Sequence, residues 1–171
     1  MVNKLSKENL KKYRDKIDVI DSKLLKLMQA RANAAFKIGQ IKLELDPNSS
    51  LYKPDREADV LRNILKENDG KISDKKIQII FRELIAACLA LEEKIKVAYL
   101  GPEGTHSEAA LINKFGSSAV RVEATSIEDV FKKIQSKEVS LGIVPVENSS
   151  EGVINSTLNS LADHNLMICG E

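Results

Sequence analysis

The sequence predicts an all-α domain of three helices, followed by part of an α/β domain. Two observations lead to this prediction. Residues 1–94 are rich in Lys, Glu, Leu and Ala, contain two glycines and two prolines, and carry apolar residues at helical spacing. Residues 96–171 hold six glycines and short runs of Val, Ile and Leu, which is typical of alternating strands and helices. The two predicted domains are therefore residues 1–94 and 95–171.

The composition argues against a nucleic-acid-binding protein and against a membrane protein. Charged residues make up 30% of the sequence but nearly cancel, with a net charge of +1, and Trp is absent. Such a balance is not typical of a nucleic-acid-binding surface. No stretch approaches the roughly 20 apolar residues that cross a bilayer, and the N-terminal residues contain no apolar run typical of a signal peptide.

The two cysteines, Cys88 and Cys169, each lie within apolar sequence. A single pair predicts neither a disulfide framework nor a zinc site, and His106 and His164 add no metal-ligand spacing. We therefore expect reduced, buried thiols in a cytoplasmic protein, with no metal ion and no cofactor.

The first predicted helix covers residues 6–45. Its apolar residues follow a heptad pattern that includes Leu10, Ile17 and Leu24, and the polar segment 46–50 ends it. At about 1.5 Å per residue the helix is a rod of roughly 60 Å, about twice the width of a compact domain of this size. Such a rod cannot bury its apolar stripe within its own chain, so we expect a two-fold homodimer with the long helices side by side.

Two shorter helices are predicted to follow. One begins at Pro54, a favourable first-turn residue, and stops at Asp69 and Gly70. The next begins after Ser73 as its N-cap. The apolar stripe of this third helix consists of Ile77, Ile80, Phe81, Leu84, Ile85, Cys88 and Leu91.

Basic residues interrupt the apolar seam of the first helix. Arg31 occupies a heptad position of this apolar seam, where a charged side chain must find a partner or reach water. It therefore forms a buried ion pair, extends its charged end to solvent, or belongs to an anion site. Lys42 follows 11 residues later, about 20° around the helix and roughly 16 Å along it, so the two can grip a small dianion. Arg14 lies 17 residues before Arg31, roughly 25 Å away, and reaches such a site only across an antiparallel dimer.

Two further charged pairs lie at helix ends. Arg56 and Glu57 open the second helix, where a solvated first turn is the alternative to a functional role. Cys88 and Glu92 are one turn apart at the end of the third helix, where Glu92 belongs either to the surface or to a site. Spacing alone leaves both pairs undecided.

The second domain is expected to begin with a buried strand over residues 96–101. The segment Gly-Pro-Glu-Gly-Thr, which ends at Thr105, predicts a tight turn into a helix that starts near Ser107. Exposed amides at such a helix start suit a carboxylate or a phosphate.

A later segment of the second domain has the same character. Asn148 and Ser149 follow a predicted strand over residues 141–146, and open α/β sheets place ligands after such strands. A capped turn is the alternative interpretation. Residues 166–169 predict a further strand.

Several ordered charges in the first domain resemble the all-helical chorismate mutase family. The resemblance covers about residues 8–93 and rests on four segments. These are Tyr-Arg-Asp-Lys-Ile-Asp at 13–18, Leu-Leu-Lys-Leu-Met-Gln-Ala-Arg at 24–31, Lys-Ile-Gly-Gln-Ile-Lys at 37–42 and Asp-Arg-Glu-Ala at 55–58. The resemblance implies an intertwined dimer with two equivalent sites that convert chorismate to prephenate.

The resemblance also implies how the substrate is held. Arg31, Arg56 and Arg14 of the partner subunit are expected to hold its two carboxylates. Glu57 is expected to accept a hydrogen bond from its hydroxyl group.

Two residues are implied as donors to the substrate's ether oxygen, Lys42 and Glu92. Many family members carry Gln at the position of Glu92, and Glu donates a hydrogen bond only when it is protonated. The resemblance therefore predicts a reaction rate that falls as pH rises through the pKa of Glu92. Cys88, expected at the same site, stands where the family often has a small polar residue.

The second domain resembles the start of a prephenate dehydratase domain. The matching segments are Val-Ala-Tyr-Leu-Gly-Pro-Glu-Gly-Thr at 97–105, followed by Ser107, and Gly-Ile-Val-Pro-Val-Glu-Asn-Ser-Ser-Glu-Gly at 142–152. A mutase helix bundle followed directly by this domain is the layout of the bifunctional mutase–dehydratases of phenylalanine synthesis. The residues implied as contacts for prephenate are Thr105, Ser107, Asn148 and Ser149.

The family continues with the rest of a two-lobed domain, including a Thr-Arg-Phe motif, and with an ACT domain. This sequence contains no Thr-Arg-Phe. We therefore expect only the first part of the two-lobed domain, without dehydratase activity. The alternative function is a non-catalytic dimerising helical module that carries a partial small-molecule-sensing α/β domain.

Overall fold

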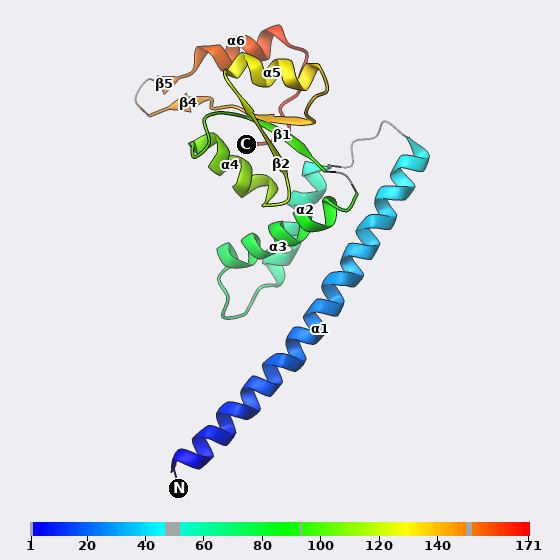
Figure 1. The fold of residues 1–171 in the computed structure, drawn as a ribbon, viewed down its shortest axis with the longest axis vertical. Coiled ribbons are helices and arrows are strands. Elements are labelled where there is room, and N and C mark those ends of the chain that lie inside the picture. Colours follow the sequence, from blue (N-terminus) through cyan, green and yellow to red (C-terminus); the bar gives the residue numbers. More distant parts are fainter. Residues whose placement is uncertain (1, 47–51, 93, 150–151) are drawn as a thin grey trace.

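The computed structural model describes residues 2–46, 52–92, 94–149 and 152–171. Three helices come first, and a small α/β part follows (Figure 1). This order confirms the predicted fold class. No helix among the described residues is long and apolar enough to cross a bilayer.

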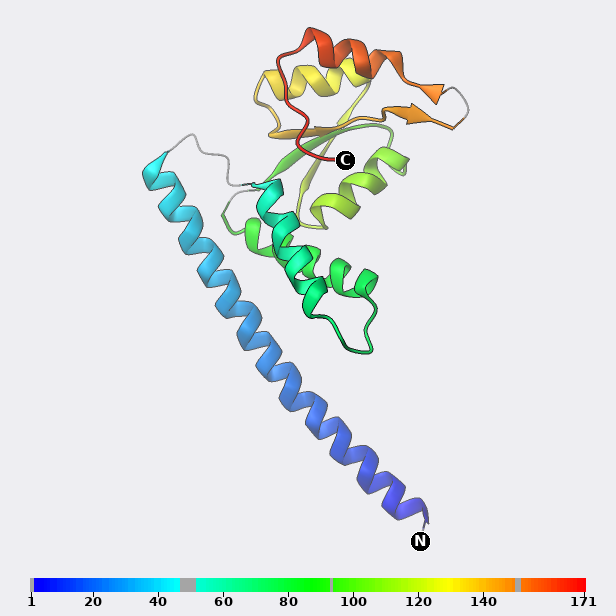
Figure 2. The same cartoon turned by 180° about the vertical axis from the view of Figure 1, so that it is seen from behind.

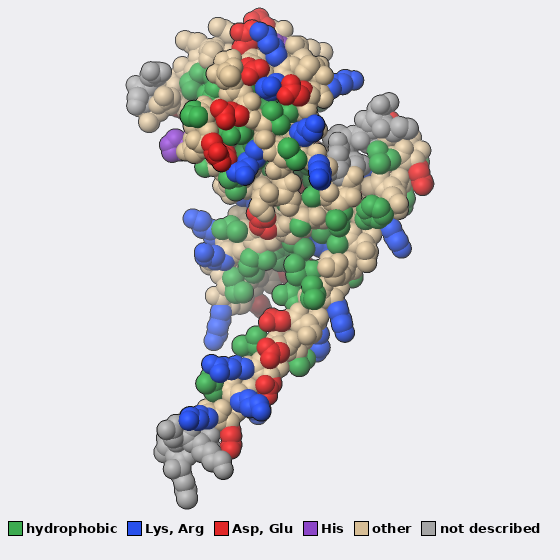
Figure 3. All heavy atoms as spheres, in the orientation of Figure 1, with side chains coloured by type: hydrophobic (Ala, Val, Ile, Leu, Met, Phe, Trp, Pro, Cys, Tyr) green, Lys and Arg blue, Asp and Glu red, His purple; other side chains and the backbone are tan. Residues whose placement is uncertain are grey.

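The first helix, α1, covers Val2–Leu45 and is a single rod whose N-terminal half extends away from the rest of the chain (Figures 1 and 2). It begins four residues before the predicted start and ends at the predicted residue. Part of α1 packs against α3. Many large apolar side chains of α1 nevertheless remain exposed, and Figure 3 shows them along the rod. They are Leu10, Tyr13, Ile17, Val19, Ile20, Leu24, Leu25, Leu27, Met28, Phe36, Ile38, Ile41, Leu43 and Leu45.

The helices α2, Pro54–Glu67, and α3, Asp74–Leu89, pack against each other. Pro54 opens α2 as predicted, and acidic residues in its first turn suit the positive end of the helix dipole. The helix ends at Glu67, before the predicted Asp69 and Gly70, and the extended backbone of Asn68 caps it. The Asn68 side-chain amide donates to the Ile72 carbonyl and to Asp74 Oδ1. These bonds fix the turn between the two helices.

The α/β part is built on a parallel sheet with strand order β2-β1-β3. The strands are β1, Lys96–Leu100, β2, Val120–Ala124, and β3, Leu141–Ile143. Helices α4, His106–Phe115, and α5, Ile127–Gln135, cover opposite faces of the sheet (Figure 1).

Side chains of β1 alternate between two hydrophobic clusters, as a strand buried on both faces requires. Val97 and Tyr99 belong to the cluster with Leu111 of α4. Ala98 belongs to the cluster with Val130 of α5. The central strand therefore supplies the core on both sides.

The last elements form a small hairpin and a helix. The hairpin pairs β4, Glu147–Asn148, with β5, Gly152–Val153, and α6, Asn155–Asp163, packs against α5. The strand predicted over residues 141–146 ends early, at Ile143.

Two predictions for the end of the sequence are wrong. Residues 166–169 form no strand, because the described sheet offers no neighbour for their backbone groups and apolar composition alone does not supply one. Met167 is 92% exposed. Cys169 is also exposed rather than buried, whereas Cys88 is buried as expected.

Candidate active site

Glu92 lies against α1, immediately after the end of α3. Its backbone N–H donates to the Leu89 carbonyl at 2.9 Å, which continues the helical turn. A Cβ atom built on Gly39 of α1 would lie 2.5 Å from Glu92 Oε2 and 2.9 Å from its Cδ. Only a residue without a side chain therefore lets the carboxyl group approach the α1 backbone so closely.

The Glu92 carboxyl group is desolvated and unsatisfied. Its Oε2 atom is buried and has no hydrogen-bond partner among the described residues. Burial raises the pKa of Glu92, and the positive charge of Lys42 acts in the opposite direction. A carboxyl group whose pKa is raised retains its proton more readily and can then donate a hydrogen bond. Buried polar atoms without a partner are uncommon in folded proteins and often mark a functional site.

Lys42 and Arg31 lie on α1 on either side of Gly39. Lys42 follows Gly39 by less than one helical turn, and Arg31 precedes it by about two turns. Both basic residues are half-buried. Arg31 is thus more buried than Leu24 and Ile38, which occupy the same heptad position of α1 and are more than half exposed. The structure thus places a lysine and a carboxyl group together, with an arginine on the same helix.

Arg14 lies on the N-terminal half of α1, which extends away from the other elements (Figure 1). Arg14 is exposed and lies about 25 Å before Arg31 along the helix. A single chain therefore does not bring Arg14 to Lys42 and Glu92. The predicted contribution of Arg14 requires a second copy of the chain.

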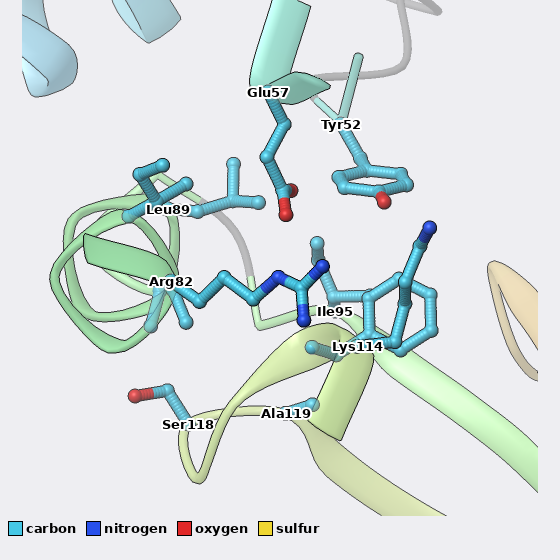
Figure 4. A pocket seen from close by; sticks show the side chains of 12 residues that line it. Tyr52, Glu57, Arg82, Leu89, Ile95, Lys114, Ser118 and Ala119 are labelled. Carbon is cyan, nitrogen blue, oxygen red and sulfur yellow. The ribbon is translucent and has the colours of Figure 1, made fainter. Parts of the chain in front are cut away.

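Arg56 and Glu57 open α2, which packs against α3. Arg56 is exposed, whereas the Glu57 carboxyl group points toward Arg82 of α3 in the junction with α4 (Figure 4). Burial raises the pKa of Glu57, and the charges of Lys114 and Arg82 lower it. Within one chain the structure therefore directs Glu57 to the junction rather than to Glu92.

The junction encloses a cavity of about 20 Å³, which is room for roughly one water molecule. Tyr52 packs edge-on against Phe115 of α4, with ring centroids 5.4 Å apart. A neighbouring pocket of about 300 Å³ shares Tyr52, Glu57, Arg82 and Lys114 with it. Arg82 and Lys114, which line the cavity beside the predicted Glu57, were missed because nothing in their spacing sets them apart.

Gly39 was also missed, although it gave a signal. A glycine within a long helix lowers its stability by about 1 kcal/mol relative to alanine, so it often marks a close approach. Cys88 was predicted at the site, and it is buried one turn before Glu92.

In the α/β part, the hydroxyl group of Thr105 is used by the fold. It donates to the Leu100 carbonyl at 3.1 Å and accepts from the Glu108 N–H at 3.5 Å as the N-cap of α4. The Gly104 N–H donates to buried Glu108 at 2.6 Å, and Arg121 pairs with the same carboxylate at 2.7 Å. The turn expected to bind an anion is thus held by the protein's own carboxylate.

Ser107, Asn148 and Ser149 lie toward one edge of the sheet. Ser107 is half-buried in the first turn of α4, after β1. Asn148 and Ser149 are exposed and follow β3, which is parallel to β1. Thr105 and Ser107 thus follow β1 and Asn148 and Ser149 follow β3, and the carboxyl ends of parallel strands share an edge of the sheet. Among the residues the structure covers, no group of three or more metal-ligating side chains occurs.

The long, partly uncovered helix α1 carries Lys42 beside the Glu92 carboxyl group, and a parallel sheet follows in the same chain. Residues 13–93 match the family model of chorismate mutase type II, and residues 97–171 match that of prephenate dehydratase. The chain belongs to the family of bifunctional chorismate mutase/prephenate dehydratases.

Three relatives illustrate the similarity, and each is described as a bifunctional chorismate mutase/prephenate dehydratase. The protein of Pseudomonas aeruginosa is 41% identical over 167 residues, which cover 96% of this chain and 46% of the relative. That of Aquifex aeolicus is 41% identical over 168 residues, with the same coverage. That of Escherichia coli K12 is 26% identical over 183 residues, covering 97% of this chain and 47% of the relative. The chain spans about half the length of the curated relatives it matches.

Proposed function

We propose that this chain rearranges chorismate to prephenate. The observation that carries the proposal is the close approach of Glu92 to α1 beside Lys42, within the segment that matches chorismate mutase type II. The proposed mutase unit is residues 1–94, and residues 95–171 form the proposed first part of a dehydratase unit.

The reaction breaks one C–O bond and forms one C–C bond through a cyclic transition state. No nucleophile is needed, so the protein has two tasks. It must hold the enolpyruvyl arm over the ring, and it must stabilise the negative charge that grows on the ether oxygen. Lys42 and protonated Glu92 are the proposed donors to that oxygen. Each donor is expected to contribute about 10²–10³ in rate, by analogy with oxyanion donors.

Arginine side chains are the proposed clamps for the two carboxylates. Arg31, Arg56 and Arg14 of the partner subunit take this role, and Glu57 takes the substrate hydroxyl. Cys88, one helical turn before Glu92, is proposed to line the substrate site, where the family often has a small polar residue. Because Glu57 faces the junction in a single chain, its proposed role requires the side chain to turn toward α1 when the dimer and substrate are in place.

A homodimer through α1 completes the proposed site. Leu10, Tyr13, Ile17, Ile20, Leu24 and Leu27 of α1 are exposed at heptad spacing and form an apolar stripe, and monomeric proteins rarely leave large apolar surfaces open. An antiparallel second copy covers this stripe and brings its Arg14 to the site. We place this dimer in the cytoplasm, as the unpaired Cys88 and Cys169 favour a reducing compartment.

The α/β part supports a proposed place in phenylalanine synthesis. In the longer protein, a complete dehydratase converts prephenate to phenylpyruvate with loss of water and carbon dioxide. Ser107, Asn148 and Ser149 are the proposed prephenate contacts, and Thr105 shapes the turn beside them. We propose that this chain by itself does not form phenylpyruvate.

The experiment is to add the chain to chorismate and follow the ultraviolet absorbance of chorismate. Loss of absorbance with formation of prephenate supports the proposal. Binding without turnover indicates a small-molecule sensor, and neither binding nor turnover indicates a dimerising module. Either of these last two results overturns the proposed function.

A further inference from the structure

The position of Glu92 is fixed from the α/β part of the chain. Leu89 and Ile95 lie three residues before and after Glu92, and both pack into the cluster formed around Val97 and Leu111. Ile95 is 8% exposed. Three residues span at most about 10 Å, so the segment that carries Glu92 has little freedom relative to this core.

A second attachment joins α3 to the turn after α4. The Glu83 carboxylate accepts from the Ser117 N–H at 3.1 Å and from the Ser117 hydroxyl at 2.9 Å. These bonds link a residue in the middle of α3 to the α/β part. They resist rotation of α3 about its own axis.

A third attachment is the close approach of Gly116, after α4, to the Ala86 side chain of α3. Gly116 has a φ of +71°, and a Cβ atom built on it would lie 2.7 Å from the Ala86 side chain. Because Ala86 is three residues after Glu83, the same face of α3 meets the turn at both residues. The helix is therefore held against the α/β part along its C-terminal half.

On its other side, the Glu92 carboxyl group meets Gly39 of α1. Among the described residues, the charged group that acts on it is Lys42. We propose that the α/β part positions Glu92 for the mutase reaction, with the Glu83–Ser117 contact as the positioning pair. This inference rests on the proposed mutase function, and it makes the sheet domain a structural part of the mutase site.

The inference predicts a particular kinetic change when the pair is broken. The proposed arginine clamps lie on α1 and α2, so substrate binding is largely retained. The placement of the proton donor is lost, and a misplacement near 1 Å lowers a rate by up to about 100-fold. Here we expect a smaller displacement and a Glu92 carboxyl group that is more exposed to water. The kcat is therefore expected to be lower, and its fall with rising pH is expected to begin at a lower pH.

The experiment uses Glu83→Ala in the full 171-residue chain, which removes the acceptor for both the N–H and the hydroxyl group of Ser117. The expected result is a kcat lowered about 10-fold with KM changed less than about twofold, and a high-pH limb of kcat that moves to lower pH. Ser117→Ala keeps the backbone N–H donor to Glu83 and is expected to show a smaller change in the same direction. Glu83→Gln retains an acceptor oxygen for Ser117 and is expected to restore most of the wild-type limb.

The matched control is Ser126→Ala. Ser126 Oγ accepts from the Asp129 N–H at 3.1 Å and caps α5, on the face of the sheet away from α3 (Figure 1). Loss of this N-cap lowers the stability of the α/β part by what one capping hydrogen bond contributes. It leaves the Glu83–Ser117 contact intact. The pH limb and kcat of this variant are expected to equal those of the wild type.

The outcomes separate this inference from the proposed function. If the wild type consumes no chorismate, the proposed function fails. If it does, and Ser117→Ala and Glu83→Ala keep the wild-type kcat and pH limb, the positioning role is overturned. A fall in kcat of equal size in Glu83→Ala and Ser126→Ala, without movement of the high-pH limb, also overturns it.

Discussion

Replacing Gly39 by alanine tests the contact between α1 and Glu92 with a single methyl group. The new Cβ atom would lie 2.5 Å from Glu92 Oε2, so the carboxylate must retreat by about 0.9 Å to reach an ordinary contact of 3.4 Å. A displacement near 1 Å of a catalytic group lowers kcat by up to about 100-fold. We expect a loss of this order for Gly39→Ala.

The effect on stability is expected to be much smaller. Alanine is favoured over glycine within a helix by about 1 kcal/mol, while overpacking costs about 1–3 kcal/mol. The two terms oppose each other, so the free energy of unfolding is expected to fall by no more than about 2 kcal/mol. Thermal unfolding by circular dichroism measures this change alongside the loss of chorismate absorbance.

Gly70→Ala is the matched control for this prediction. A Cβ atom on Gly70 would have Asn68 Oδ1 as its nearest neighbour, at 3.9 Å, so it meets open space. This variant is expected to retain the wild-type kcat. The reasoning is refuted if Gly39→Ala folds and retains it as well.

Three further predictions concern the same site. Homodimers of Arg14→Ala and of Arg31→Ala are each expected to lose activity. Mixing the two variants is expected to restore up to about one quarter of the wild-type rate, because half of the dimers are mixed and each mixed dimer has one intact site of two. Absence of recovery in mixed dimers argues against a site shared between subunits. Lys42→Met is expected to lower kcat by about 10²–10³, and a loss below about tenfold contradicts its role as an ether donor. Burial raises the pKa of Glu92 in the folded protein, so protonation of Glu92 contributes to folding stability. This contribution to the free energy of unfolding is complete below the usual Glu pKa and is lost as pH rises through the pKa of Glu92 in the folded protein. Glu92→Gln is therefore expected to gain melting temperature relative to the wild type as pH rises, and parallel curves for the two proteins refute the shift.

The helices could be predicted because their signals are local. The heptad pattern of α1, Pro54 at the start of α2 and Ser73 before α3 depend only on neighbouring residues. The central strand β1 was likewise visible as a short apolar run.

The features that were missed depend on contacts between distant segments. Gly39 meets Glu92 across more than 50 residues of sequence, and no spacing rule connects them. The direction of Glu57 depends on Arg82 and Lys114, which tertiary packing brings beside it. Thr105 was expected at a ligand, but its hydroxyl group serves the turn and caps α4.

The most direct test of the account is the pH dependence of the mutase kcat for the wild type and for Glu92→Gln, measured side by side. The wild-type rate is expected to fall as pH rises through the pKa of Glu92 in the complex, because the deprotonated carboxylate cannot donate to the ether oxygen. Glu92→Gln is expected to keep its rate over the same range. Identical flat profiles for the two proteins contradict the central claim that Glu92 is the proton-bearing donor of this site.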